Sequence, residues 1–175
     1  MNVQTLNSEV LTAADPLVVV KREDVETLVE RASQNERGRI RLCTHKSEND
    51  LLHEMIIVHG NDAYVRPHKH LNKSESMYII QGVMDFVIFD ELGEVTKVIP
   101  MGEYASGLGV FFRSDQPIYH TLLIRSPALT FLETTNGPFK RADTVFAPWS
   151  PDGTDPLLVR RYLDDIEKKV AAIKI

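Results

Sequence analysis

Residues 60–82 read GNDAYVRPHKHLNKSESMYIIQG, and this stretch decides the fold. One residue separates His68 from His70, Glu75 follows after four more residues, and Gly82 follows after a further six. Because side chains alternate between the two faces of a strand, histidines two positions apart enter the same space, where a carboxylate from the next strand can join them. The spacing therefore predicts a metal site built on two neighbouring strands.

A fourth ligand is expected at His120, which precedes the apolar run Leu122–Ile124. Three imidazoles and one carboxylate suit Zn, Fe, Mn, Ni or Cu, and they leave open positions on a five- or six-coordinate ion. The predicted cofactor is one divalent metal ion held by His68, His70, Glu75 and His120. Glu75 has a second interpretation, as a general base or an acceptor beside the ion.

Composition restricts the classes of partner. The chain has 175 residues and a formal net charge of −5, so we expect one domain and no electrostatic attraction to nucleic acid or to an anionic membrane. Its single cysteine, Cys43, cannot form an internal disulfide, which favours the cytoplasm. Leu17–Val20 is too short for the core of a signal peptide, and no apolar run approaches membrane-spanning length. The remaining partner class is a small molecule or a protein.

The pattern along the chain predicts an all-β fold with a helix at each end. Helical spacing of apolar residues appears at 22–34 and 156–172, and residues 1–15 lack periodicity, which indicates a loosely held arm. Many short strands without helices between them indicate a sandwich or barrel. We therefore expect an extended arm at 1–20, one domain at 21–151 and a C-terminal helix at 152–175. The expected strands are 40–44, 53–59, 64–68, 76–81, 84–89, 95–99, 110–112, 119–125 and 129–134.

The histidine, glutamate and glycine spacing resembles the first motif of the cupin superfamily, and His120 in its apolar strand resembles the second. More specifically, residues 21–151 resemble WbuC-type cupin metalloproteins. The stretches that carry this resemblance are Arg37-Gly38-Arg39 with the strand ending at His45, Tyr64-Val65-Arg66-Pro67-His68-Lys69-His70, Phe89-Asp90-Glu91-Leu92-Gly93, and Phe146-Ala147-Pro148-Trp149-Ser150-Pro151.

The resemblance implies a double-stranded β-helix (jelly-roll) barrel with a bound divalent metal, in a family often encoded beside surface-polysaccharide biosynthesis genes. His45 matches a histidine of the WbuC-type pattern, so the resemblance implies a catalytic role for it. The alternative is a rim histidine bonded to a loop carbonyl. One departure concerns the second motif, which usually has Pro and Gly five and three residues before its histidine. Here Asp115 and Pro117 occupy those positions, so the turn before His120 is altered.

Three further side chains are candidates for contact with a substrate. Arg66 and Tyr64 share the parity of His68 on the expected strand, so Arg66 is predicted to clamp a carboxylate or phosphate, with an internal ion pair to Glu133 as the alternative. Tyr64 is either a hydrogen-bond donor in the same cavity or a packing ring. Glu133 ends the inward-facing series Leu129-Phe131-Glu133 and is either paired with an arginine or available for proton transfer.

These residues favour a cytoplasmic, metal-dependent enzyme that acts on a small polar metabolite. The resemblance supplies a sugar or sugar derivative as substrate, and the residues suit isomerase, epimerase or lyase chemistry with Glu75 or His45 moving a proton. An Fe(II)-dependent dioxygenase and a non-catalytic, ligand-sensing cupin are the alternatives. We also expect a homodimer through β-strands and the N-terminal helix, because a small barrel leaves an edge that must be covered.

Overall fold

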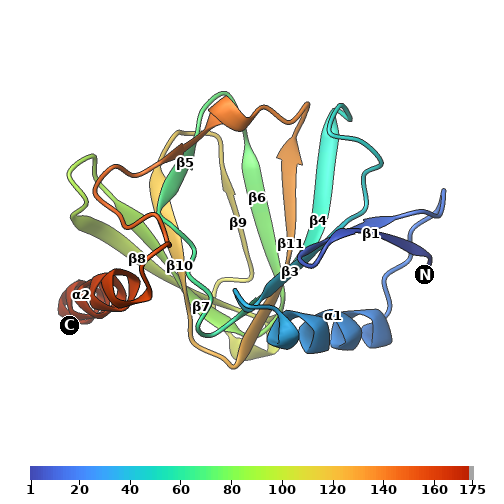
Figure 1. Ribbon diagram of the computed structural model, residues 1–175. Helices are drawn as coiled ribbons and strands as arrows, with labels where there is room; N and C mark the ends of the chain where they lie inside the picture. The colour runs from blue at the N-terminus through green and yellow to red at the C-terminus, as the bar shows by residue number, and fades with distance from the viewer. Residues whose placement is uncertain (174–175) are drawn as a thin grey trace.

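The structure, a computed structural model, describes residues 1–173 and consists of two facing β-sheets with one helix against each (Figure 1). The first sheet has seven strands in the order β1 (Val3–Asn7), β2 (Val10–Ala13), β3 (Arg39–Cys43), β4 (Leu52–Gly60), β11 (Ala128–Asn136), β6 (Glu75–Gln81) and β9 (Phe111–Ser114). The second has five strands in the order β12 (Thr144–Phe146), β5 (His68–His70), β10 (Tyr119–Ile124), β7 (Val83–Phe89) and β8 (Val95–Gly102). Neighbouring strands are antiparallel except β2 and β3.

The core lies between the sheets and follows from the alternation along each strand. Met77 and Ile79 of β6 and Phe131 of β11 are buried from one sheet, and Phe86 and Leu122 are buried from the other, in one apolar cluster. Strands β6 and β11 run antiparallel in register, so these inward residues form continuous rows. The fold is therefore the all-β, double-stranded β-helix barrel with terminal helices that the sequence predicted.

A sharp corner joins the two sheets at Gly82, between β6 and β7. Its φ of +95° lies in the left-handed region, and a Cβ atom there would lie 2.4 Å from the carbonyl oxygen of Ala128. Only glycine fits this corner.

Helix α1 (Arg22–Gln34) covers the outer face of the seven-stranded sheet. Its buried residues Leu28 and Ala32 pack with Leu42 and Val58. The apolar stripe of the helix is thus buried within its own chain, so it needs no partner molecule to cover it.

Helix α2 (Pro156–Ile173) covers the outer face of the five-stranded sheet. Ile166 and Val170 are buried there with Val87 and Leu123. The helix begins where the sequence predicted, with proline at its first position and the Asp155 carboxylate accepting a hydrogen bond from the Leu157 N–H at 2.8 Å. No helix within residues 1–173 has the length and apolar character required to cross a membrane.

The N-terminal segment is held more firmly than the sequence predicted. Strands β1 and β2 form a hairpin, β2 pairs in parallel with β3, and the side chains of Leu11 and Ala13 are buried. The prediction of a loosely held arm is wrong for Val3–Ala13, because two buried side chains at alternate positions are too few to produce a visible period. Two short 3₁₀ helices, Tyr104–Ser106 and Arg141–Asp143, complete the structure.

Candidate metal centre

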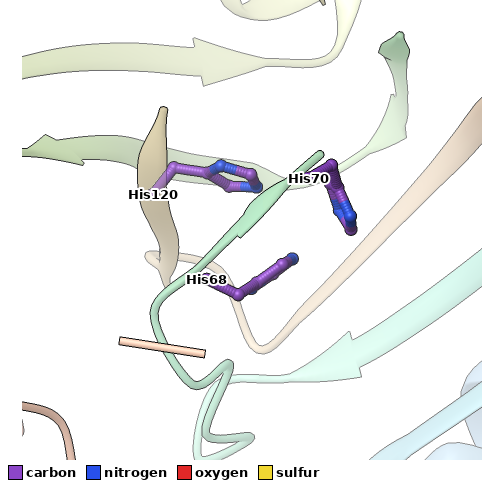
Figure 2. A group of neighbouring side chains, drawn as sticks. All are labelled: His68, His70 and His120. Carbon is purple, nitrogen blue, oxygen red and sulfur yellow. The ribbon is translucent and has the colours of Figure 1, made fainter. Parts of the chain in front are cut away.

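Three histidines converge inside one end of the barrel (Figure 2). His68 and His70 occupy the first and last positions of the three-residue strand β5, and His120 lies on the neighbouring strand β10, directly opposite His68. One ligand nitrogen from each residue lies within 4.8 Å of those of the other two. The structure therefore brings together the three imidazoles that the sequence predicted as ligands.

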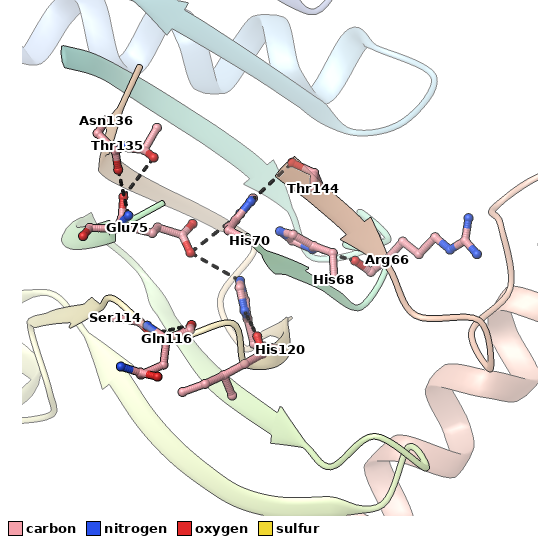
Figure 3. Close-up of polar contacts among 12 residues, drawn as sticks. Arg66, His68, His70, Glu75, Ser114, Gln116, His120, Thr135, Asn136 and Thr144 are labelled. Atoms are coloured by element: carbon pink, nitrogen blue, oxygen red, sulfur yellow. Dashed lines mark hydrogen bonds and ion pairs between the residues drawn. The ribbon is translucent and has the colours of Figure 1, made fainter. Parts of the chain in front are cut away.

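Each imidazole is oriented by a hydrogen bond at its Nδ1 atom (Figure 3). His68 Nδ1 lies 2.8 Å from the carbonyl oxygen of Arg66, and His120 Nδ1 lies 3.0 Å from that of Ile118. His70 Nδ1 lies 3.3 Å from the hydroxyl oxygen of Thr144. A proton on Nδ1 that is donated to a fixed oxygen leaves Nε2 with its lone pair, which is the form of histidine that binds a metal ion.

Glu75 faces this cluster from the other sheet. It is the first residue of β6, its side chain is buried, and its Oε2 atom lies 3.5 Å from His120 Nε2 and 3.8 Å from His70 Nε2. A carboxylate oxygen is thus close to two of the three ligand nitrogens. This position suits a fourth metal ligand or an acceptor beside the ion.

Burial sets the protonation state of these residues. It lowers the pKa of His68 to about 4, and it lowers the pKa of His70 to about 3 with help from the neighbouring imidazoles. Burial also lowers the pKa of His120. At neutral pH all three rings are neutral, and three neutral imidazoles beside one carboxylate form a donor set that fits a divalent transition metal.

Glu133 lies on the inner surface of the barrel, as its parity predicted. It sits on β11 opposite Met77 of β6 and Met55 of β4, both core residues. Burial, reinforced by the negative charge of Glu75, raises the pKa of Glu133 to about 8. The predicted alternative, an ion pair with Arg66, does not form within residues 1–173, so Glu133 holds a proton near neutral pH.

Arg66 and Tyr64 lie outside the cluster of histidines. Strand β5 begins at His68, so the expected strand at 64–68 is wrong and the shared parity on which the Arg66 prediction rested does not apply. In Figure 3 the Arg66 side chain extends away from the three imidazoles. Its guanidinium donates to the Ser150 hydroxyl at 3.1 Å and to the carbonyl oxygens of Ala147 and Ser150, both at 3.3 Å.

Tyr64 has a similar structural environment. Its hydroxyl donates to the carbonyl oxygen of Pro151 at 2.9 Å, and its ring meets that of Tyr162 on helix α2 edge to face. Tyr64 is therefore a packing ring, which was one of the two interpretations of this residue.

His45 is bonded to a backbone carbonyl, as its structural alternative predicted, but that carbonyl belongs to strand β4 and not to a loop. Its ring stacks on that of His53 with centroids 4.1 Å apart, and its Nδ1 atom lies 3.3 Å from the carbonyl oxygen of Glu54. It is not among the ligand nitrogens that converge on the site. The structure gives His45 a partner in the neighbouring strand rather than a place at the metal centre.

Sequence reasoning missed Thr144. This residue begins β12, the edge strand that pairs with β5 on the side away from β10. Its hydroxyl fixes His70, yet nothing in the local sequence distinguishes it from any other threonine. The segment that follows β12 packs against the five-stranded sheet, where Ala147 is buried and the Trp149 ring packs against Phe89.

Comparisons with known proteins agree with the fold. A family model described as a domain of unknown function, DUF6016, matches residues 20–101. Protein SO0799 from Shewanella oneidensis is similar in structure, with a TM-score of 0.53 and 14% identity, over 73% of this chain and 85% of that one. At this identity the likeness concerns the fold. No curated protein matches the chain.

Two named enzymes show weaker structural likeness. Oxalate decarboxylase from Bacillus subtilis has 21% identity and a TM-score of 0.45 over 56% of this chain. The present chain covers only 24% of that enzyme. A sugar phosphate isomerase of the cupin superfamily from Silicibacter pomeroyi has 17% identity and a TM-score of 0.39, over 50% of this chain and 52% of that one.

Proposed function

We propose that this chain is a metal-dependent cupin enzyme of the WbuC-like type, acting on a small polar metabolite. The observation that carries the proposal is the convergence of His68, His70 and His120, each with Nδ1 at a hydrogen-bonding oxygen. Orienting three imidazoles in this way costs conformational freedom and requires burial of polar rings. A core that only had to fold would place apolar side chains there.

The chemistry proposed is proton transfer at a polarised substrate. A divalent ion at this site would supply a Lewis acid for a carbonyl or hydroxyl group. Glu75, whose pKa burial raises to about 7, suits the acceptance and return of a proton near neutral pH. Glu133, on the same inner surface, is available to donate a hydrogen bond to a bound substrate.

These roles correspond to an isomerase, epimerase or lyase. The resemblance to WbuC-type proteins supports a sugar or sugar derivative of surface-polysaccharide metabolism as the substrate, and a cytoplasmic location fits that role. The same four donors also permit Fe(II), so a dioxygenase is the second candidate. A third candidate is a non-catalytic cupin in which the metal presents a ligand to a partner.

The test is turnover by the metal-loaded protein of a defined set of phosphorylated and nucleotide-linked sugars, followed by mass spectrometry and by an oxygen electrode. The account predicts conversion of at least one sugar without oxygen uptake, lost in Glu75→Gln. Oxygen consumption would replace the proposal by the dioxygenase. Binding without conversion of any sugar, by protein that holds its metal, would favour the non-catalytic candidate.

A further inference from the structure

A polar groove lies on the outer side of the seven-stranded sheet, separate from the metal centre. It has a volume of about 450 Å³ and is lined by the loop between β5 and β6, by residues of β4, β6, β9 and β11, and by Asp115 after β9. Ser76 pairs with both Thr134 and Arg113 across these strands, and all three alternate with inward residues, so they form one outward-facing row. None of the four predicted metal ligands lines the groove.

Two cations line this groove and form no ion pair within residues 1–173, although the charge of Lys73 also acts on the buried carboxyl groups of Glu75 and Glu133. Lys73 is half-buried, and within residues 1–173 its ammonium forms no ion pair; it lies 5.3 Å from the centre of the Phe139 ring. Arg113 donates one hydrogen bond, to the Ser74 hydroxyl at 3.1 Å, and forms no ion pair in the described chain either. The acidic residue of the lining, Asp115, pairs with neither cation; its carboxylate accepts from Gln116 at 3.4 Å.

Uncharged donors and acceptors surround the two cations. The hydroxyls of Ser76 and Thr134 and the side-chain amide of Asn72 line the groove and make no hydrogen bond to another described residue. Asn136 uses its side-chain oxygen to accept from the Ser74 N–H at 2.7 Å, and its NH₂ group has no hydrogen-bond partner within residues 1–173. Hydroxyl and amide groups of this kind recognise the hydroxyls of a sugar.

We propose that this groove binds a small anionic sugar, whose phosphate or carboxylate lies between Lys73 and Arg113. A guanidinium offers two parallel donors to a pair of anionic oxygens, and an ammonium adds a point charge from the other side. The volume is in the range of small-molecule sites. The proposal does not rest on metal binding, because its residues are distinct from the four ligands.

The test is a nuclear magnetic resonance titration of the full chain with three probes: inorganic phosphate, glucose 6-phosphate and glucuronate. Binding should shift the amide signals of residues 72–74, 113 and 134–136 and should saturate. Glucuronate binding without phosphate binding would assign the site to carboxylates, and the reverse would assign it to phosphoryl groups. The absence of saturable shifts at these residues with all three probes would overturn the proposal.

Variants identify the cations responsible. Lys73→Met with Arg113→Met should weaken binding by about a hundredfold or more, because the loss of each charge-assisted contact with the anion costs about tenfold or more. Lys97→Met removes an exposed positive charge from β8 in the other sheet and should change affinity less than about twofold, since it lies outside the groove. Equal affinity in the double variant and the wild type would overturn the proposal.

Two further proteins keep the result interpretable. Arg113→Lys alone, a mild change at an exposed residue, should weaken binding several-fold and supplies the test if the double variant does not fold. The variant His68→Ala with His70→Ala should bind the sugar probes in the groove as the wild type does. Loss of groove binding there, in folded protein, would assign the anion to the metal centre and contradict the proposal.

Discussion

His68 lies directly opposite His120 in the antiparallel pairing of β5 with β10, with their ring centroids 4.6 Å apart. This single pairing brings together two residues that are 52 positions apart in the sequence (120 minus 68). Strand β5 also pairs with β12, so the strand that carries two of the predicted ligands is held from both sides. The metal centre therefore depends on the position of a three-residue strand.

The first prediction concerns Thr144, whose hydroxyl lies beside His70 Nδ1. Thr144→Val keeps the shape of the side chain and removes the acceptor, so the His70 ring loses its fixed orientation. We expect metal affinity to fall by about tenfold, the lower end of the effect of such supporting hydrogen bonds. Competition with a chromophoric chelator measures the affinity. Thr144→Ser is the matched control and should retain it; equal affinity for Val and wild type would contradict the role.

The second prediction concerns Arg66 as a clamp on the segment that follows β12. Arg66→Lys replaces a fork that reaches Ser150 and Ala147 by a point charge, so those carbonyl oxygens lose donors. We expect the free energy of unfolding to fall by about 1–3 kcal/mol, with metal stoichiometry unchanged. Arg160→Lys, on the exposed face of α2, should leave stability nearly unchanged. A stable Arg66→Lys protein with weakened sugar binding would instead support the substrate clamp.

The alternation of side chains along a strand was sufficient to predict the ligands that lie on one strand or on strands joined by a short loop. His68 and His70 share a face because strand side chains alternate, and Glu75 follows on the next strand after a short loop. Amphipathic spacing likewise predicted both helices. His120 required the second motif, since only the barrel topology places β10 beside β5.

The supporting residues could not be predicted for a related reason. Thr144 lies 74 positions after His70 and meets it only through the pairing of β12 with β5. The shared parity predicted for Arg66 and His68 is wrong because alternation holds only inside a strand, and β5 starts two residues after Arg66. His45 stacks on His53 because the pairing of β3 with β4 brings these parts of the chain together, and no local pattern in the sequence specifies that pairing.

The third prediction is a homodimer formed through the free edge of β1. All five residues of β1 are exposed, and the strand lies at the edge of the seven-stranded sheet with its N–H and C=O groups available (Figure 1). Light scattering should give about twice the 19.8 kDa of one chain. Leu6→Glu places a charge on the edge and should shift the mass to that of a monomer. Leu92→Glu, at an exposed turn in the other sheet, is the control.

A monomeric mass for the wild type at micromolar concentration would contradict the dimer. The same mass for wild type and Leu6→Glu, both dimeric, would place the interface elsewhere. In that case the opposite edge strand, β9, is the remaining free edge of this sheet.

The fourth prediction is a pH dependence of stability due to His59. Burial, helped by the positive charges of Arg39 and Arg41, lowers the pKa of His59 to about 3, and its Nδ1 atom has no hydrogen-bond partner in the described chain. In the unfolded chain a histidine takes up its proton near pH 6.5. Between these two pKa values the unfolded state binds more protons than the folded state. The contribution of neutral His59 to the free energy of unfolding is therefore fully present above about pH 6.5 and is lost as the pH falls.

Urea unfolding at several pH values, with metal removed, measures this effect. His59→Asn cannot take up the proton, so its stability should decrease less between pH 6.5 and pH 4, by up to about 1.4 kcal/mol per pH unit relative to the wild type. Parallel curves for the two proteins would show that His59 is protonated equally in the folded and unfolded states.

The most direct test of the metal centre is the metal content of the purified protein, measured by inductively coupled plasma mass spectrometry. X-ray absorption spectroscopy of the same samples measures the metal–ligand distances. Wild type and His59→Asn, which loses a histidine outside the site, should each hold one divalent ion per chain with nitrogen and oxygen donors at about 2.0–2.3 Å. The variant His68→Ala with His70→Ala should hold none. One ion per chain retained in that double variant would contradict the account.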